Sequence, residues 1–191
     1  MDLKVIIIIA FTYLYGFFEI LMWIILRKKM EKKIEKKGDK GSFWIMFIFI
    51  AIGYSLSFAV GSTKTGRMVH WDTFFIIGAL LAIIGLFIRI YSILTLKQQF
   101  TYTVTKIEDH ALIETGLYKW IRHPGYLGQL IIFEATAIAL ANWLSVILMF
   151  IPVFIGYYYR IRTEEKFMLD QWGLKYSEYQ KRTKRLIPGI Y

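Results

Sequence analysis

The sequence predicts an all-α integral membrane protein with about five transmembrane helices, including a C-terminal helical hairpin. Hydrophobic residues make up 57% of the 191 residues, whereas soluble domains usually contain about 45–50%. These residues are gathered in blocks of about 20, the length that crosses a bilayer as a helix. No glycine-rich phosphate-binding loop follows a strand pattern, so no Rossmann fold is expected.

Three of the apolar blocks fall in the first half of the chain. They cover residues 5–26, 43–60 and 73–96. We therefore treat residues 1–96 as a unit of three transmembrane helices. Glu19 and Arg89 interrupt the first and third blocks. Because a charge inside the bilayer is costly, we expect these two residues to form a structural pair.

The second half of the chain, residues 97–191, is predicted to carry the functional site. A polar segment, 97–125, leads into the mostly apolar run 126–159. As one helix this run would span about 50 Å, far more than the bilayer core of about 30 Å. We therefore expect a membrane hairpin with a tight turn at Asn142. Residues 160–191 are polar and are expected to form a helix and a tail.

The basic residues predict the orientation in the membrane. The net charge is +10, from 24 Lys and Arg against 14 Asp and Glu, and the excess lies in segments 27–41, 97–126 and 160–191. Basic segments stay on the cytosolic side, so we expect the N-terminus outside and the C-terminus in the cytosol, in the plasma membrane if the source is prokaryotic. The lysine-rich run 28–40 is interpreted as a helix extension beside membrane lipids, not as a nucleic-acid site.

Metal chemistry and thiol chemistry are not expected. The chain has no cysteine and 3 histidines, which excludes thiolate metal sites, disulfides and cysteine nucleophiles. We therefore predict no metal. Glu134, inside the first arm of the hairpin, is kept as a candidate functional residue because an intramembrane carboxylate is costly.

The candidate site lies where the hairpin begins and ends, since both roots of a hairpin share one side of the membrane. The first root, Gly116–Tyr126, reads GLYKWIRHPGY. Pro124 suits the first position of a helix, and His123 would then be the N-cap. We expect the free N–H groups of Gly125 and Tyr126 to attract an anion such as a carboxylate or phosphate. A capped helix entry at the interface is the simpler alternative.

The second root, 157–167, reads YYYRIRTEEKF. Arg160 and Glu164 share one face of a helix, and Arg162 and Glu165 share another. These pairs could be surface ion pairs, which stabilise a protein little. Alternatively, an arginine at the membrane edge could hold a substrate anion by two parallel hydrogen bonds while a glutamate holds a cationic ligand group.

Three motifs in this order resemble the isoprenylcysteine carboxyl methyltransferase family, in a compact prokaryotic form. They are G-x-Y-x-x-x-R-H-P-x-Y at Gly116–Tyr126, R-x-x-x-E-E at Arg160–Glu165 and G-x-x-Y-x-x-Y at Gly173–Tyr179. The resemblance covers residues 100–191. It implies a membrane enzyme that uses S-adenosylmethionine to methylate the C-terminal carboxylate of a prenylated cysteine, leaving S-adenosylhomocysteine. It also implies a cytosolic cofactor pocket formed by the C-terminal half.

The resemblance assigns roles residue by residue. Arg160 would bind the substrate carboxylate and Glu164 the cofactor. The other cofactor-binding residues would be His110, Ala111, Leu112 and Ile113, as a strand of backbone, then Tyr118, and finally His123, Pro124, Gly125 and Tyr126 at the helix N-terminus. A helix N-terminus suits the carboxylate of the cofactor, and aromatic faces suit its sulfonium. A carboxylate acceptor is already ionised at neutral pH, so no general base is expected.

Three other functions stay open from the residues alone. A methyltransferase could act on an amine or hydroxyl of a small lipid, which would require a base such as Glu134, Glu165 or His123. The chain could instead be an oxidoreductase with a nicotinamide cofactor, like the related sterol reductases. It could also be a membrane anchor or assembly partner without enzymatic activity, although the polar clusters at the hairpin roots argue against this function.

Overall fold

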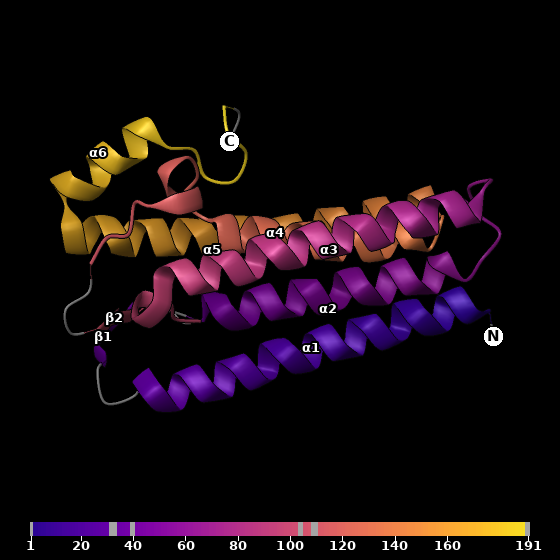
Figure 1. Ribbon diagram of the computed structural model, residues 1–191, viewed down its shortest axis with the longest axis horizontal. Helices are drawn as coiled ribbons and strands as arrows, with labels where there is room; N and C mark the ends of the chain where they lie inside the picture. The colour runs from indigo at the N-terminus through magenta and orange to yellow at the C-terminus, as the bar shows by residue number, and fades with distance from the viewer. Residues whose placement is uncertain (1, 31–33, 39–40, 103–104, 108–110, 190–191) are drawn as a thin grey trace.

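The fold is a bundle of long helices that run side by side and alternate in direction (Figure 1). The computed structural model describes residues 2–30, 34–38, 41–102, 105–107 and 111–189. The long helices are α1 (Leu3–Met30), α2 (Ser42–Gly61), α3 (Trp71–Leu96), α4 (Pro124–Ala139) and α5 (Trp143–Trp172). Two 3₁₀ turns, η2 (Lys97–Gln99) and η3 (Gly116–Lys119), lie between α3 and α4, and the short helix α6 (Leu174–Arg182) follows α5.

Membrane spans can be assigned by length and composition. Within the described residues, four helices are long and apolar enough to cross a membrane, namely α1, α2, α3 and α5. Helix α4 has 16 residues, fewer than the roughly 20 that a bilayer requires, so it is the short arm of the hairpin. Helix α5 continues to Trp172, well past residue 159, where the sequence predicted the membrane arm to end.

A short antiparallel pair of strands joins the helices. Strand β1 (Ile34–Lys37) pairs with β2 (Thr105–Ile107) near one end of the bundle (Figure 1). The prediction of helix throughout residues 28–40 is therefore wrong, because pairing with a distant segment outweighs local helix propensity there. The backbone strand expected at residues 110–113 is also not found: Ala111–Ile113 is irregular, and His110 lies outside the described residues.

The turn between the hairpin arms lies where the sequence predicted it. Asn142 precedes α5, and its Oδ1 accepts the N–H groups of Leu144 at 3.0 Å and Ser145 at 3.2 Å. Its Nδ2 donates to the carbonyl oxygens of Val60 at 3.2 Å and Thr65 at 2.8 Å. One side chain therefore caps α5 and ties the hairpin turn to the end of α2.

The apolar core lies between α1, α2, α4 and α5. Its buried members are Tyr15, Phe43, Met46, Ile132, Phe133, Ala137, Met149, Val153 and Tyr157. Met46 and Phe133 belong both to this core and to the wall of a cavity near the end of the bundle. The same packing that stabilises the helices therefore shapes one side of the candidate site.

Helix α3 approaches α4 closely through glycines. A Cβ atom on Gly85 would lie 2.8 Å from the carbonyl oxygen of Gly128, and one on Gly128 would lie 2.7 Å from that of Gly85 and 2.8 Å from the backbone nitrogen of Arg89. Small residues allow such close backbone contact between membrane helices. The contact places Arg89 beside the first turns of α4.

We expect Gly128→Ala to destabilise the protein by about 1–3 kcal/mol, because the added methyl group meets backbone atoms of α3 that cannot rotate away. Thermal unfolding in detergent measures the effect. The matched control is Gly16→Ala on α1, where no described atom outside the helix's own nearby backbone lies within 4 Å of the added Cβ atom. This control should unfold at the wild-type temperature or slightly above, since alanine favours helix. Equal losses in the two variants would contradict this explanation.

Candidate active site

A cavity of about 550 Å³ extends from α6 toward the middle of the bundle. The predicted site residues that line it are Ala111, Leu112, Ile113, Tyr118, His123, Gly125, Tyr126, Arg160 and Glu164. Pro124 is fully buried at the first position of α4 and does not line the cavity. The hairpin therefore brings its two roots to one cavity, as the sequence predicted.

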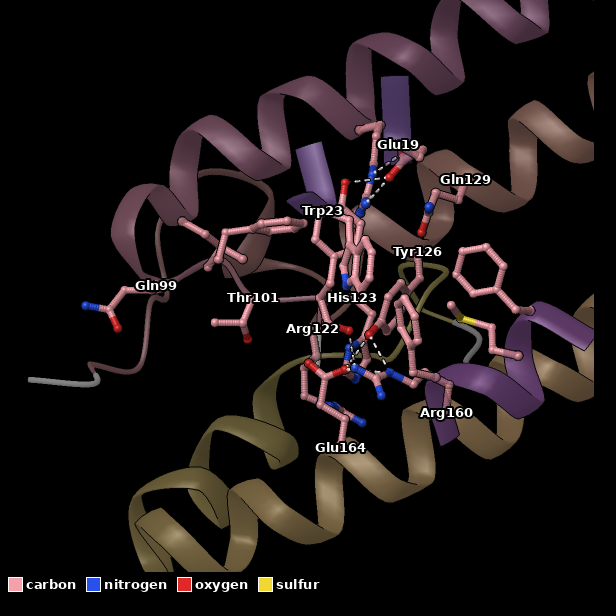
Figure 2. Close-up of a pocket in the computed structure, with 18 of the residues that line it drawn as sticks. Glu19, Trp23, Gln99, Thr101, Arg122, His123, Tyr126, Gln129, Arg160 and Glu164 are labelled. Carbon is pink, nitrogen blue, oxygen red and sulfur yellow. Dashed lines mark hydrogen bonds and ion pairs between the residues drawn. The ribbon is translucent and has the colours of Figure 1, made fainter. Parts of the chain in front are cut away.

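Arg160 and Glu164, one turn apart on α5, share the hydroxyl of Tyr126 at the start of α4 (Figure 2). The Tyr126 hydroxyl donates to Glu164 Oε2 at 2.5 Å and accepts from Arg160 Nε at 3.2 Å. Arg160 Nε lies 4.0 Å from Glu164 Oε2. The cationic Arg160 and the anionic Glu164 thus line the cavity next to each other, with the Tyr126 hydroxyl bonded to both.

In the described part of the chain, neutral oxygen atoms of Tyr126, Ser42 and Tyr102 orient the guanidinium group of Arg160. Besides Tyr126, Nη1 donates to Ser42 Oγ at 2.7 Å and Nη2 to the carbonyl oxygen of Tyr102 at 2.8 Å. Arg160 is only 1% exposed, although it lines the cavity. The position of the guanidinium is therefore fixed by residues of α2, α4 and the segment after α3, each at least 34 positions from Arg160 in the sequence.

The start of α4 differs in detail from the prediction. Pro124 is the first residue of the helix and His123 is the N-cap, as expected. The N–H of Tyr126, however, donates to the His123 carbonyl at 3.1 Å, so the expectation that it is free to bind an anion is wrong. A Cβ atom on Gly125 would lie 3.0 Å from Arg89 Nη1. A larger side chain at position 125 would therefore press on this guanidinium.

Glu165 pairs with residues outside α5, so the surface ion pair with Arg162 that the spacing left open is not formed. It is buried, and its two oxygen atoms accept from Arg122 Nε at 2.7 Å and Arg185 Nε at 2.9 Å. His123 Nε2 lies 3.4 Å from the same carboxylate. Arg162 is exposed. The helix spacing was correct, but Glu165 points toward the loop before α4 and the tail after α6, which local sequence cannot reveal.

The C-terminal segment 179–185 holds the loop that carries the first root. The Lys184 carbonyl accepts the N–H of Arg122 at 2.8 Å, and the Tyr179 hydroxyl donates to the Tyr118 carbonyl at 2.7 Å. A parallel bridge between Ile121 and Lys184 continues this pairing. The wall of the cavity at Tyr118 is thus fixed by residues far along the chain.

Several lining residues were given no role by the sequence analysis. They are Gln99, Thr101, Met168, Trp172, Tyr176 and Tyr179. Tyr176 and Tyr179 belong to the third sequence motif, which was the available signal. The Tyr176 hydroxyl is buried and has no hydrogen-bond partner among the described residues. A buried hydroxyl on a cavity wall indicates a place for a polar ligand group.

The phenols of Tyr118 and Tyr176 stay protonated at neutral pH. Burial, followed by the negative charge of Glu164, raises the pKa of Tyr118 well above its ordinary value. Burial, followed by the charges of Glu165 and Glu164, raises the pKa of Tyr176 in the same way. Both groups can therefore donate hydrogen bonds, and neither can serve as a base near neutral pH.

The expected pair of Glu19 and Arg89 is confirmed. Arg89 Nε and Nη2 donate to the two carboxylate oxygens of Glu19, each at 2.9 Å. The hydroxyls of Tyr15 and Tyr102 donate to the same carboxylate at 2.6 Å and 2.7 Å. Glu19 is labelled in Figure 2, and both members of the pair line the cavity. The pair joins α1 to α3 inside the bundle.

Glu134 does not line this cavity, and the described residues contain no cluster of metal ligands. Both carboxylate oxygens of Glu134 are buried and make no hydrogen bond within the described structure, and the residue is absent from the cavity wall. Among residues 2–30, 34–38, 41–102, 105–107 and 111–189, no group of three or more His, Cys, Asp or Glu is close enough together to hold a metal ion.

Between α1, α2 and α4 the wall of the cavity is mostly apolar, apart from the Glu19–Arg89 ion pair. The residues of this part, which we call the apolar chamber, are Gly16, Ile20, Trp23, Phe43, Met46, Phe47, Ile50 and Phe133. A cavity that is charged at one end and apolar at the other suits an amphipathic ligand. The fold and the site therefore define a multi-pass membrane protein whose cavity has both charged and apolar walls.

Comparison with known families specifies this class further. Residues 77–170 match the isoprenylcysteine carboxyl methyltransferase family. This segment contains Arg160, Glu164 and the first root, but not α1 or α2. Over this segment, which is about half of the chain, the protein is similar to the isoprenylcysteine carboxyl methyltransferase family.

Individual relatives agree with this family. The protein-S-isoprenylcysteine O-methyltransferase of Saccharomyces cerevisiae is 36% identical over 117 residues, which are 60% of this chain and 49% of the yeast protein. That of Tribolium castaneum is 33% identical over 126 residues, 65% of this chain and 44% of the relative. The solved eukaryotic intramembrane Ras methyltransferase has a TM-score of 0.63 and 28% identity, covering 75% of this chain and 52% of that chain. The chain thus spans about half the length of these relatives.

Proposed function

We propose that this chain is an S-adenosylmethionine-dependent membrane methyltransferase that esterifies the C-terminal carboxylate of a prenylated cysteine or a similar lipid-linked carboxylate. The observation that carries the proposal is the position of Arg160. Its guanidinium group is buried, oriented by three oxygen atoms, and placed between Glu164 and the apolar chamber. The match to the family and the names of the relatives support the same reaction.

The residues around Glu164 fit the proposed cofactor. S-adenosylmethionine supplies an electrophilic methyl group on a sulfonium. Glu164 would hold its cationic amino group, and the aromatic faces of Tyr118 and Tyr126 would hold the adenine or the sulfonium. The Tyr176 hydroxyl, which has no partner among the described residues, offers a donor to a polar group. The backbone of Ala111–Ile113, together with His123 and Gly125, would complete the cradle.

Arg160 and the apolar chamber fit the proposed acceptor. A guanidinium binds a carboxylate through parallel charge-assisted hydrogen bonds, and an attached prenyl chain would lie in the chamber. Because the acceptor carboxylate is ionised at neutral pH, ester formation moves no proton. The task of the protein is therefore to orient the carboxylate oxygen toward the methyl group and to exclude water.

For the membrane orientation, we infer that the α6 end of the bundle is cytosolic and that the N-terminus lies outside. In a prokaryote the plasma membrane would then hold the protein. The loop after α1, the segment between α3 and α4, and the tail after α5 are near this end (Figure 1). Their excess of lysine and arginine supports the inference through the positive-inside rule.

The product identifies the reaction. The purified protein is incubated with methyl-labelled S-adenosylmethionine and a farnesylated cysteine whose amino group is blocked. We expect label in the lipid, released as methanol by mild base, because a methyl ester is base-labile. The same lipid with its carboxylate converted to a carboxamide should gain no label. Label that resists base would contradict the proposal and indicate methylation of an amine or hydroxyl.

The pH dependence provides a second test. An α-carboxylate has a pKa of about 3.3–3.7 and is fully ionised at neutral pH. The raised pKa values of Tyr118 and Tyr176 keep both phenols protonated. We therefore expect kcat to stay within about twofold from pH 7 to 9 in a buffer series at saturating substrates. A rate that rises steadily over this range would instead indicate an acceptor that must lose a proton.

A further inference from the structure

Tyr102 links the intramembrane ion pair to the proposed carboxylate-binding residue. Its hydroxyl donates to Glu19 Oε2 at 2.7 Å, and its carbonyl oxygen accepts from Arg160 Nη2 at 2.8 Å. Glu19 is on α1 and Arg160 is on α5. One residue in the segment after η2 therefore connects two helices that are distant in sequence.

Arg89 holds the same segment from a second side. Its guanidinium carbon lies 5.2 Å from the ring centre of Phe100 and 5.6 Å from that of Tyr102. The two rings pack edge to face with centroids 5.1 Å apart. Since Glu19 bonds both Arg89 and Tyr102, the ion pair and two aromatic rings fix residues 100–102 as one unit.

A purely stabilising role does not explain this arrangement well. Charges inside a membrane are costly, and a buried ion pair often stabilises a fold no more than apolar residues of similar volume. Glu19 also lies outside residues 77–170, which match the family.

We propose that Glu19, acting through Tyr102, is a positioning residue for Arg160. It fixes the carbonyl oxygen that accepts one N–H of Arg160, and thereby fixes the angle at which the guanidinium meets the acceptor carboxylate. The inference rests on the proposed function. Glu19 and Tyr102 touch neither reacting group in this mechanism. They act on the reaction only by holding Arg160.

Tyr102→Phe tests the proposal with little disturbance, because it removes one hydroxyl and leaves the ring and backbone. The matched control is Tyr15→Phe, which removes a hydroxyl that donates to the other oxygen of the same carboxylate at 2.6 Å. We expect Tyr102→Phe to lower kcat/KM for the farnesylated acceptor about tenfold or more. Tyr15→Phe should stay within about twofold of wild type, while the two unfolding temperatures fall equally.

Cofactor affinity separates positioning from general loosening of the fold. The dissociation constant of S-adenosylhomocysteine, measured by calorimetry, should be unchanged in Tyr102→Phe, because that variant keeps Glu164 and the first root intact. Equal loss of acceptor turnover in both tyrosine variants, or parallel loss of cofactor affinity, would overturn the inference. So would wild-type kinetics in Tyr102→Phe.

Glu19→Asp is the second variant, and it decides the matter if Tyr102→Phe does not fold. It keeps the charge but withdraws the carboxylate by one methylene group, so the same selective loss of acceptor turnover is expected. Wild-type turnover in Glu19→Asp would overturn the inference. Failure of the proposed function is distinct from these outcomes, since wild-type protein would then esterify no carboxylate at all.

Discussion

Arg160→Lys is expected to lower kcat/KM for a farnesylated cysteine by about 100-fold or more, because a misplaced reacting group can cost this much. Lysine lacks the planar fork that bonds a carboxylate at two points. It also cannot reproduce the three bonds by which Arg160 contacts Tyr126, Ser42 and Tyr102. Steady-state kinetics with the labelled cofactor measures the loss.

The same variant should keep most of its affinity for S-adenosylhomocysteine. We expect a change in dissociation constant of no more than about threefold, because Glu164 remains in place and the positive charge is conserved. The control is Arg162→Lys, two residues away on the same helix but exposed, which should behave as wild type in both measurements. Equal losses of cofactor affinity and acceptor turnover in Arg160→Lys would contradict its assignment to the acceptor.

Glu164→Gln should weaken S-adenosylhomocysteine binding about 10- to 100-fold. The substitution keeps the shape of the side chain and an oxygen that can accept from Tyr126, but removes the charge proposed to face the amino group of the cofactor. A hydrogen bond to a charged group is worth about 1.5–3 kcal/mol, which corresponds to this range. Isothermal titration calorimetry of the detergent-purified protein measures the change.

Glu178→Gln is the control for charge removal. Glu178 is exposed on α6, so the variant should bind S-adenosylhomocysteine with wild-type affinity and unfold at the wild-type temperature. Wild-type affinity in Glu164→Gln would remove this carboxylate from the cofactor site. In that case the second root of the hairpin would not be part of a cofactor site. An oxidoreductase or a membrane anchor without enzymatic activity would then have to be considered again.

Much of the fold followed from signals that act locally along the chain. Bilayer thickness and helix rise together set the length of apolar sequence that one crossing needs. The three apolar blocks of that length in the first half of the chain therefore predicted three long helices near their observed positions. The turn at Asn142 was predicted because the apolar run exceeds one crossing, and its side chain caps α5 as a local structure. The same reasoning brought Arg160, Glu164 and Tyr126 to one cavity, because a hairpin returns to the side from which it starts.

The sequence did not show which partners a side chain has when they come from distant segments. Arg162 lies three residues from Glu165, yet Glu165 bonds Arg122 and Arg185, because the loop before α4 and the tail after α6 meet beside it. Helix spacing places two residues on one face but does not show what packs against that face. The sequence likewise could not show that the N–H of Tyr126 is satisfied by His123.

The sequence by itself determined that the chain is a helical membrane protein, where its hairpin turns, and which short motifs meet at the hairpin roots. These features depend on hydrophobic length, helix capping and covalent connection, which are properties of neighbouring residues. Only the tertiary structure decided that Ser42 and Tyr102 orient Arg160, that Tyr176 offers a buried hydroxyl, and that α1 and α2 form the apolar chamber. Those arrangements depend on how separate helices pack, since packing selects partners from the whole molecule.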